Sequence, residues 1–207
     1  MISLDEIKKM ADPGYTVGRD HIRMEHPLDK ETVFEQFLQS YSVYYDVVRA
    51  DEDTDNPKFE LTGGFDAEAR FDSKSEQYFL IRAAKVADIR SAEYVFFSKR
   101  DILTYEALSG MDERVWELCL ERTKPGPDHK NTDALLVVIA HSVTGEAKDF
   151  IKKTKHSKNY RFALYGFSNY RLVVVELDKG MVYFSKQARF LMKLVGNILK
   201  EEKENSK

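Results

Sequence analysis

The chain has 207 residues, of which 43% are hydrophobic, 12% aromatic and 32% charged, and its formal net charge is −3. These values are typical of one globular domain and exclude a wholly disordered chain. The single cysteine, Cys119, excludes an internal disulfide and a cysteine-rich zinc site. The N-terminus is acidic where a secretion signal would be basic, and no apolar run approaches about 18 residues. We therefore expect a cytoplasmic protein with no membrane association.

The first half of the sequence changes from a helical to a strand pattern. Residues 1–28 are expected to form an N-terminal appendage, with a short helix over residues 3–10 that begins with a capping box. Asp29 can cap a second helix, because apolar residues recur after it with helical spacing up to Tyr41. From residue 43 to 99 the pattern predicts an antiparallel meander, most clearly in "FDAEARF", where apolar and polar residues alternate.

The second half alternates helices and strands. Helices are expected over residues 112–123, after Thr144 and after Ser185, and strands at "YRFALYGF", "YRLVVVEL" and "MVYF". The continuous apolar run "ALLVVIA" predicts a strand buried on both faces, with a local parallel arrangement between two helices. We therefore predict an α+β fold: a mixed, mostly antiparallel sheet covered by helices, in a single domain over residues 29–200, followed by a charged tail, 201–207.

Charge is distributed unevenly along the chain. Residues 1–75 carry 17 acidic and 9 basic side chains, whereas residues 150–200 carry 2 acidic and 11 basic ones. Such asymmetry is found where a protein contacts nucleic acid or another anionic partner. The alternative is that the acidic front half packs against the basic back half, and the sequence leaves both interpretations open.

The basic segment around "KKTKHSKNYRFALYGF" is the candidate anion-binding surface. Cations at the end of a helix are stabilised by its dipole, but this does not account for the cations that follow the helix. Together with exposed faces of Tyr160, Tyr165 and Tyr170, they would offer charge and aromatic planes to a single-stranded nucleic acid or a phosphorylated ligand. The predicted anion-binding residues are Lys152, Lys153, Lys155, Lys158, Arg161 and Arg171.

Two carboxylates provide the alternative, enzymatic interpretation. Asp66 and Glu68 share one face of a predicted strand, about 7 Å apart, and could hold Mg²⁺ in a metal-dependent hydrolase or nuclease-like enzyme. With Arg82 or Lys85 they loosely resemble the metal and lysine set of the PD-(D/E)xK nucleases, although Ala83 stands where that motif has an acidic residue. Otherwise they form a solvated strand face paired with neighbouring cations, and no cofactor is expected.

Two histidines flank the predicted buried strand. His129 precedes it and His141 ends it, and strand ends in mixed sheets often hold ligands. Each histidine is either functional or a locally hydrogen-bonded loop residue. No nucleotide-binding, serine-hydrolase or zinc-protease motif is present, so whether the protein is an enzyme stays open.

The segments "KNYRFALYGFSNYRLVVVEL", "EYVFF" and "KPGPDHKNTDALLVVIAHS" resemble an uncharacterised domain family of anaerobic, gut-type bacteria. The resemblance covers roughly residues 41–188, implies a single intracellular domain, and transfers no functional residue. The leading hypothesis is thus a non-enzymatic binding or interaction module. A protein partner or a homodimer formed through an exposed "MVYF" strand is a further alternative.

Overall fold

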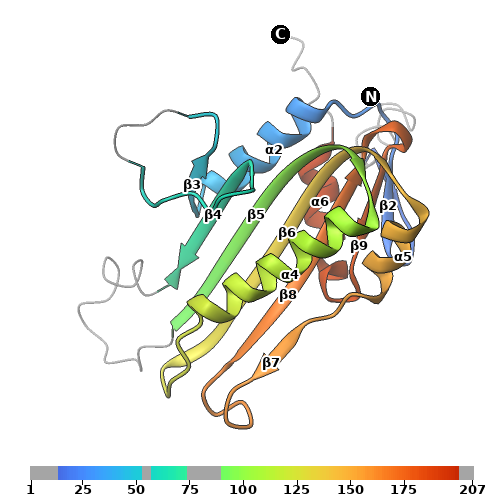
Figure 1. Ribbon diagram of the computed structural model, residues 1–207. Coiled ribbons are helices and arrows are strands. Elements are labelled where there is room, and N and C mark those ends of the chain that lie inside the picture. The colour runs from blue at the N-terminus through green and yellow to red at the C-terminus, as the bar shows by residue number, and fades with distance from the viewer. Residues whose placement is uncertain (1–13, 53–56, 74–89, 201–207) are drawn as a thin grey trace, which may run out of the picture.

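The computed structural model describes residues 14–52, 57–73 and 90–200 of the chain (Figure 1). The predicted helix over residues 3–10 and the tail at 201–207 lie outside the described residues. The strands are β1 (Tyr15–Val17), β2 (His21–Met24), β3 (Asp46–Arg49), β4 (Ala67–Asp72), β5 (Arg90–Leu103), β6 (His129–Val143), β7 (Ser157–Asn159), β8 (Phe167–Glu176) and β9 (Met181–Phe184). The α-helices are α2 (Lys30–Ser42), α4 (Tyr105–Arg122), α5 (Gly145–Lys153) and α6 (Met192–Leu199), and two 3₁₀ helices span Leu177–Lys179 and Lys186–Leu191.

One mixed sheet contains the nine strands of the described residues, in the order β1-β2-β9-β8-β6-β5-β4-β3, with β7 paired to β8. Of the eight pairings between described residues, β5 with β6 and β6 with β8 are parallel, and the other six are antiparallel. The prediction of a mixed, mostly antiparallel sheet is therefore confirmed, as is the local parallel arrangement around "ALLVVIA", which lies within β6. Helices α4 and α5 make the two crossovers between the parallel strands.

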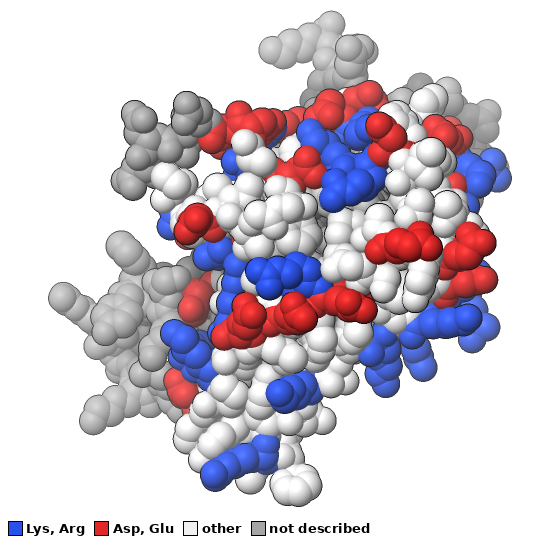
Figure 2. Space-filling model, in the orientation of Figure 1, with Lys and Arg blue, Asp and Glu red and all other residues white. Residues whose placement is uncertain are grey.

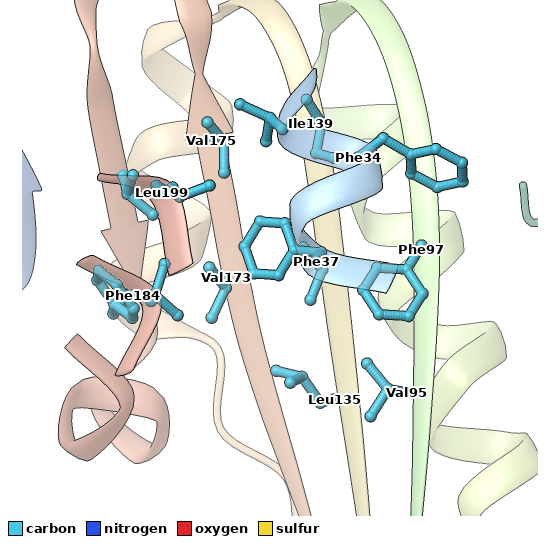
Figure 3. Packing of buried hydrophobic residues seen from close by; sticks show 14 of the residues in the cluster. Phe34, Phe37, Val95, Phe97, Leu135, Ile139, Val173, Val175, Phe184 and Leu199 are labelled. Carbon is cyan, nitrogen blue, oxygen red and sulfur yellow. The ribbon is translucent and has the colours of Figure 1, made fainter. Parts of the chain in front are cut away.

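Helices cover both faces of the sheet, which explains why β6 is apolar on both sides. Along β6, Leu135, Val137 and Ile139 face α2 and α6, while the residues between them face α4 and α5. Figure 3 shows the α2 side, where Phe34 and Phe37 of the helix lie over the sheet beside Phe97 of β5. Burying each such ring contributes about 1.5–3 kcal/mol. These contacts fix α2 on the sheet.

Two of the predicted helix starts are confirmed by their caps. Asp29 Oδ2 accepts a hydrogen bond of 2.9 Å from the Thr32 amide at the start of α2, and Thr144 Oγ1 accepts one from the Ala147 amide at the start of α5. By contrast, α4 begins at Tyr105 rather than at residue 112, because Thr104 provides the cap. Ser185 caps no helix with its side chain, since its Oγ accepts from the Leu172 amide, and a 3₁₀ helix precedes α6.

One predicted strand and one predicted exposed edge need correction, whereas the predicted strand at "MVYF" itself is confirmed as β9. The segment "YRFALYGF" is not a strand: β7 ends at Asn159, and a turn connects it to β8, closed by a hydrogen bond from the Tyr160 amide to the Gly166 carbonyl. Aromatic and aliphatic residues of this turn do not pack on the sheet, so the alternation of apolar and polar residues in this segment does not indicate a strand. The "MVYF" strand, β9, pairs with β2 on one side and β8 on the other, so it is not an exposed edge.

The described part of the N-terminal segment belongs to the same sheet. Strands β1 and β2 precede α2, and β2 pairs with β9 in register from His21 to Arg23. Tyr15 of β1 is buried against α6, where it lies close to Gly196. Residues 14–24 therefore form one edge of the sheet.

Candidate functional site

The turn between β7 and β8 projects at the lower end of the molecule in Figure 1 and has an unusual backbone. Arg161, Phe162 and Ala163 have positive φ angles of 46°, 53° and 68°, a left-handed run that costs roughly 1–2 kcal/mol per residue for side chains other than glycine. Phe162 is fully exposed and Leu164 is 75% exposed. The chain thus holds a strained turn that presents apolar side chains to solvent.

His129 supports this turn from the sheet. Its Nδ1 lies 2.8 Å from the Tyr165 carbonyl oxygen, which can only accept, so Nδ1 carries the proton. Its Nε2 lies 3.0 Å from Thr132 Oγ1, and its ring packs edge-on to Tyr160. A Cβ at Gly166 would come within 2.5 Å of the His129 ring, so glycine is needed there. His129 therefore positions the turn.

Two of the predicted cations lie on tyrosine rings of this turn. Lys158 Nζ is 5.5 Å from the Tyr160 ring centre, and the Arg161 guanidinium is 4.7 Å from that of Tyr165. Within the described residues, no ion pair involves Lys158 or Arg161. At the tip of this hairpin Figure 2 shows blue and uncharged atoms without red ones. We call Lys158, Arg161, Phe162 and Leu164 the hairpin tip.

The other predicted cations are divided between two places. Lys152, Lys153 and Lys155 are exposed at the end of α5, where Lys152 lies 3.5 Å from Asp149. Arg171 is instead on the face of β8 toward α2 and α6, only 14% exposed and paired with carboxylates. Tyr170 is completely buried on the opposite face, among the residues packed on α4 and α5, so its ring is not available as an exposed plane.

The acidic and basic halves are not joined by ion pairs in the described part of the chain. Lysines and arginines of residues 150–200 pair there only with Glu93, Asp133, Asp149 and Glu176, none of which lies in residues 1–75. Asp20 is one acidic residue near the basic half: its pKa is lowered first by a hydrogen bond from His21 and to a smaller extent by Arg189 and Lys152.

Arg171 occupies a charged cluster that crosses the three parallel strands. It donates to Glu93 Oε1 of β5 at 3.2 Å and to Asp133 Oδ2 of β6 at 2.8 Å. Asp133 also accepts from the side-chain amides of Asn131 and Asn169, and the Tyr45 hydroxyl donates to Glu93 Oε2 at 2.8 Å. We call Glu93, Asp133 and Arg171 the strand cluster.

The strand cluster lies in a cavity of about 330 Å³ between the end of α2 and α6. Its other lining residues are mostly aromatic and aliphatic: Ser40, Tyr41, Tyr44, Tyr45, Phe190, Leu191, Leu194 and Ile198. Burial raises the pKa of Glu93, and the negative charge of Asp133 raises it further, against the opposing effects of Tyr45 and Arg171. Burial also raises the pKa of Tyr41 and Tyr45. Residues with such shifts in a largely apolar cavity form a candidate binding site.

The two carboxylates of the enzymatic interpretation have other partners. Asp66 Oδ2 accepts from the Lys99 amide at 2.7 Å, and Glu68 is fully buried, with hydrogen bonds from Arg70, Arg122 and Thr62. Burial raises the pKa of Glu68, but the hydrogen bonds from Arg70, Arg122 and Thr62 outweigh it and leave the pKa lowered. Glu68 is thus not on a solvated face, because the end of α4 covers it.

No metal centre is apparent in the described part of the chain, where no group of three or more His, Cys, Asp or Glu side chains is placed to hold an ion. Arg82 and Lys85, the cations of the nuclease-like interpretation, lie outside the described residues.

The remaining candidates have local partners. His141 is half exposed and lies 3.8 Å from Asp178. His156 Nε2 contacts Asp112 Oδ2 of α4, and its ring stacks on Trp116. Burial raises the pKa of the Cys119 thiol to about 12, so this side chain is a small core residue and not a reactive thiolate.

Fold and surfaces together define an α+β domain with a mixed sheet, helices on both faces, a basic projecting hairpin and a charged cavity. The chain belongs to the family described as a domain of unknown function, DUF8052, whose model matches residues 29–196. No curated protein and no solved structure matches the chain. None of the helices described here has both the length and the apolar character needed to span a bilayer.

Proposed function

We propose that the protein is a non-enzymatic binding module that contacts an anionic partner through the hairpin tip. The observation that carries the proposal is the position of Lys158 and Arg161: both are exposed, lie on tyrosine rings, and have no ion pair within the described residues. Cations that an internal carboxylate neutralises would gain little from an external anion, whereas these two remain available.

The partner that best suits this surface carries phosphates and planar rings, as single-stranded nucleic acid does. Lysine and arginine contact phosphates, and an exposed aromatic ring such as Phe162 offers a stacking surface for a base. Lys152, Lys153 and Lys155 at the end of α5 extend the positive charge along the chain leading into β7. As part of this proposal we place the protein in the cytoplasm and treat residues 29–200, together with strands β1 and β2 of the same sheet, as one domain.

The test is the binding of a fluorescent single-stranded oligonucleotide, measured by anisotropy over a series of salt concentrations. The double variant Lys158→Ala/Arg161→Ala removes both tip cations. We expect weaker binding and a salt dependence whose slope falls by about 1.4, since each lost phosphate contact contributes about 0.7 for a single strand. Phe162→Ser in the same assay is expected to lower affinity without changing the slope, because stacking carries no counterion release.

The matched control is Arg19→Ala/Arg23→Ala, which removes two exposed cations from the β1–β2 region. If the control weakens binding as much as the tip variant, the interaction depends on overall charge and the proposed surface is wrong. No oligonucleotide binding even at low salt would also refute the nucleic-acid proposal. In that case, capture of a protein that the tip variant fails to retain would identify a protein partner instead.

A further inference from the structure

The cavity between α2 and α6 contains more negative than positive charge. Among the described residues, the charged side chains that line it are Glu93, Asp133 and Arg171, two carboxylates against one guanidinium. Arg171 donates to both carboxylates, so its own charge is already balanced. Asp133 accepts two further hydrogen bonds from asparagine amides, whereas among the described residues Glu93 has the neutral Tyr45 hydroxyl as its one partner besides Arg171. Glu93 is therefore the least compensated charge in the cavity.

The walls above Glu93 are aromatic. Tyr41 and Tyr45 pack edge to face with their ring centres 4.9 Å apart, and Tyr44, 70% exposed, lines the same cavity. Phe190, which is 66% exposed, also lines the cavity, and the Arg171 guanidinium lies 5.0 Å from its ring centre. Aromatic rings around a carboxylate are the arrangement by which proteins bind organic cations, because the ring faces are electronegative and the carboxylate supplies the opposite charge.

A groove lined by both polar and apolar side chains continues from the cavity. A second hollow, of about 450 Å³, lies between α2 and α6 and shares Ser40, Leu194 and Ile198 with the first. Its other lining residues are Gln36, Gln39, Val43, Asn197 and Lys200. A ligand with its charged end at Glu93 would therefore have room for an aliphatic chain along α2 and α6.

From this geometry we propose that the α2–α6 cavity binds an alkylammonium ligand, with the ammonium group beside Glu93 and the tyrosine rings, and the aliphatic chain between the two helices. The raised pKa of Glu93 is in line with this, since burial and the charge of Asp133 disfavour its carboxylate and a neighbouring ammonium group would stabilise it. This site lies on the sheet face covered by α2 and α6 and is independent of the hairpin tip.

The experiment is a titration of the isotope-labelled full chain with hexyltrimethylammonium, followed by NMR and by calorimetry. Hexanol and hexanoate serve as neutral and anionic probes of the same chain length. We expect the ammonium probe to bind, with shifts at Tyr44, Tyr45 and Leu194, and to bind at least about fivefold tighter than hexanol. Hexanoate is expected to bind most weakly, because the cavity has an excess of negative charge.

Two variants test the assigned residues. Glu93→Gln keeps the shape and removes the charge, so it is expected to reduce the preference for the ammonium probe over hexanol to about one. Tyr44→Ala changes an exposed ring and should leave the fold intact while weakening ammonium binding about two- to fivefold. Glu113→Gln, an exposed change on α4 at the opposite face, is the matched control and should alter nothing.

Three results would overturn the proposal. Equal affinities for hexanol and the ammonium probe would show that the cavity binds apolar chains without selecting for positive charge. Tighter binding of hexanoate would assign recognition to Arg171. Absence of binding by any probe in a chain shown by its NMR spectrum to be folded would leave the cavity without a ligand of this class.

Discussion

Arg161 and Arg171 lie close together in the sequence and have opposite environments. Arg161 is exposed in the hairpin tip, on the ring of Tyr165, with a positive φ and no ion pair in the described chain. Arg171 is 14% exposed in the strand cluster, held by Glu93 and Asp133. The first arginine is available to a partner and the second holds the structure together. A count of basic residues treats them as equal, although only one of them belongs to a basic surface.

The difference follows from where each residue falls relative to the parallel strands. Arg171 is on the face of β8 that also presents Val173 and Val175, so the side chain enters the layer under α2 and α6. Arg161 precedes β8, in a turn that contributes to neither core cluster. A cation two residues before an apolar stripe of the same strand is thus directed inward, whereas one in the connecting turn is not.

The largest expected effect comes from Arg171→Ala. Removing the guanidinium leaves two mostly buried carboxylates without a cation, and breaking such a pair costs about 3 kcal/mol of the free energy of unfolding. Urea denaturation followed by circular dichroism measures this change. The triple variant Arg171→Leu/Glu93→Gln/Asp133→Asn, which removes all three charges, should recover most of the stability. A single variant as stable as the wild type would show that the strand cluster does not hold the sheet together.

Much of the fold could be predicted from the sequence because local signals and tertiary structure agree there. The stripe of α2, the caps at Asp29 and Thr144 and the apolar run of β6 each depend on short-range periodicity or on one hydrogen bond. The turn between β7 and β8 could not be predicted in this way. Its residues alternate like a strand, but the left-handed backbone depends on His129 and Gly166, which are distant from each other in the sequence.

The strand cluster could not be predicted because it depends on the pairing of strands. A partial signal was present: Glu93, Asp133 and Arg171 each stand two residues before an apolar residue of the same strand face. Only the register, in which Glu93 lies opposite Asp133 and Leu135 opposite Arg171, brings the three together. Similarly, Glu68 was expected on a solvated face, and nothing local in the sequence shows that Arg122 and the end of α4 cover it.

A second, smaller effect concerns the pH dependence of stability. Because the folded state raises the pKa of Glu93 above its ordinary value of 4.5, the folded protein holds this proton more tightly than the unfolded chain. The stabilising contribution of the protonated form is present below 4.5 and is lost as the pH rises through the folded pKa, by up to about 1.4 kcal/mol per pH unit. The titratable and charged groups that face this carboxyl are Asp133, Tyr41, Tyr45 and Arg171. All four remain in the variant Glu93→Gln, which removes the carboxyl alone.

Stability curves of the wild type and Glu93→Gln over this range test the sign. As the pH increases, the free energy of unfolding of Glu93→Gln should rise relative to that of the wild type. Glu113→Gln shows how much this free energy changes with pH when an exposed carboxylate is removed. A shift in favour of the wild type would mean that Arg171 and Tyr45 outweigh burial. Glu68 is the opposite case: its pKa is lowered, so its contribution is present above 4.5 and is lost as the pH falls.

The left-handed backbone of the turn between β7 and β8 predicts that a glycine substitution there will stabilise the protein modestly. Ala163 has a φ of 68°, where glycine is free of the steric cost that alanine bears, so Ala163→Gly should stabilise the fold by about 0.5–1 kcal/mol. Ala107→Gly, at an exposed helical position of α4, is the matched control and should destabilise it by a similar amount. If both substitutions destabilise the protein, the turn is not left-handed in solution.

The smallest expected effect is that of Arg161→Ala, which should leave the urea midpoint unchanged, because its contact with Tyr165 is at the surface and no buried carboxylate loses a partner. The same substitution should weaken oligonucleotide binding, whereas Arg171→Lys, which keeps the charge inside the strand cluster, should leave binding unchanged. Loss of stability in Arg161→Ala would mean that the hairpin tip is part of the folded core. Loss of binding in Arg171→Lys without unfolding would place the anionic partner on the α2 side of the sheet. The comparison of the two arginines therefore separates residues that hold the fold from residues that meet a partner.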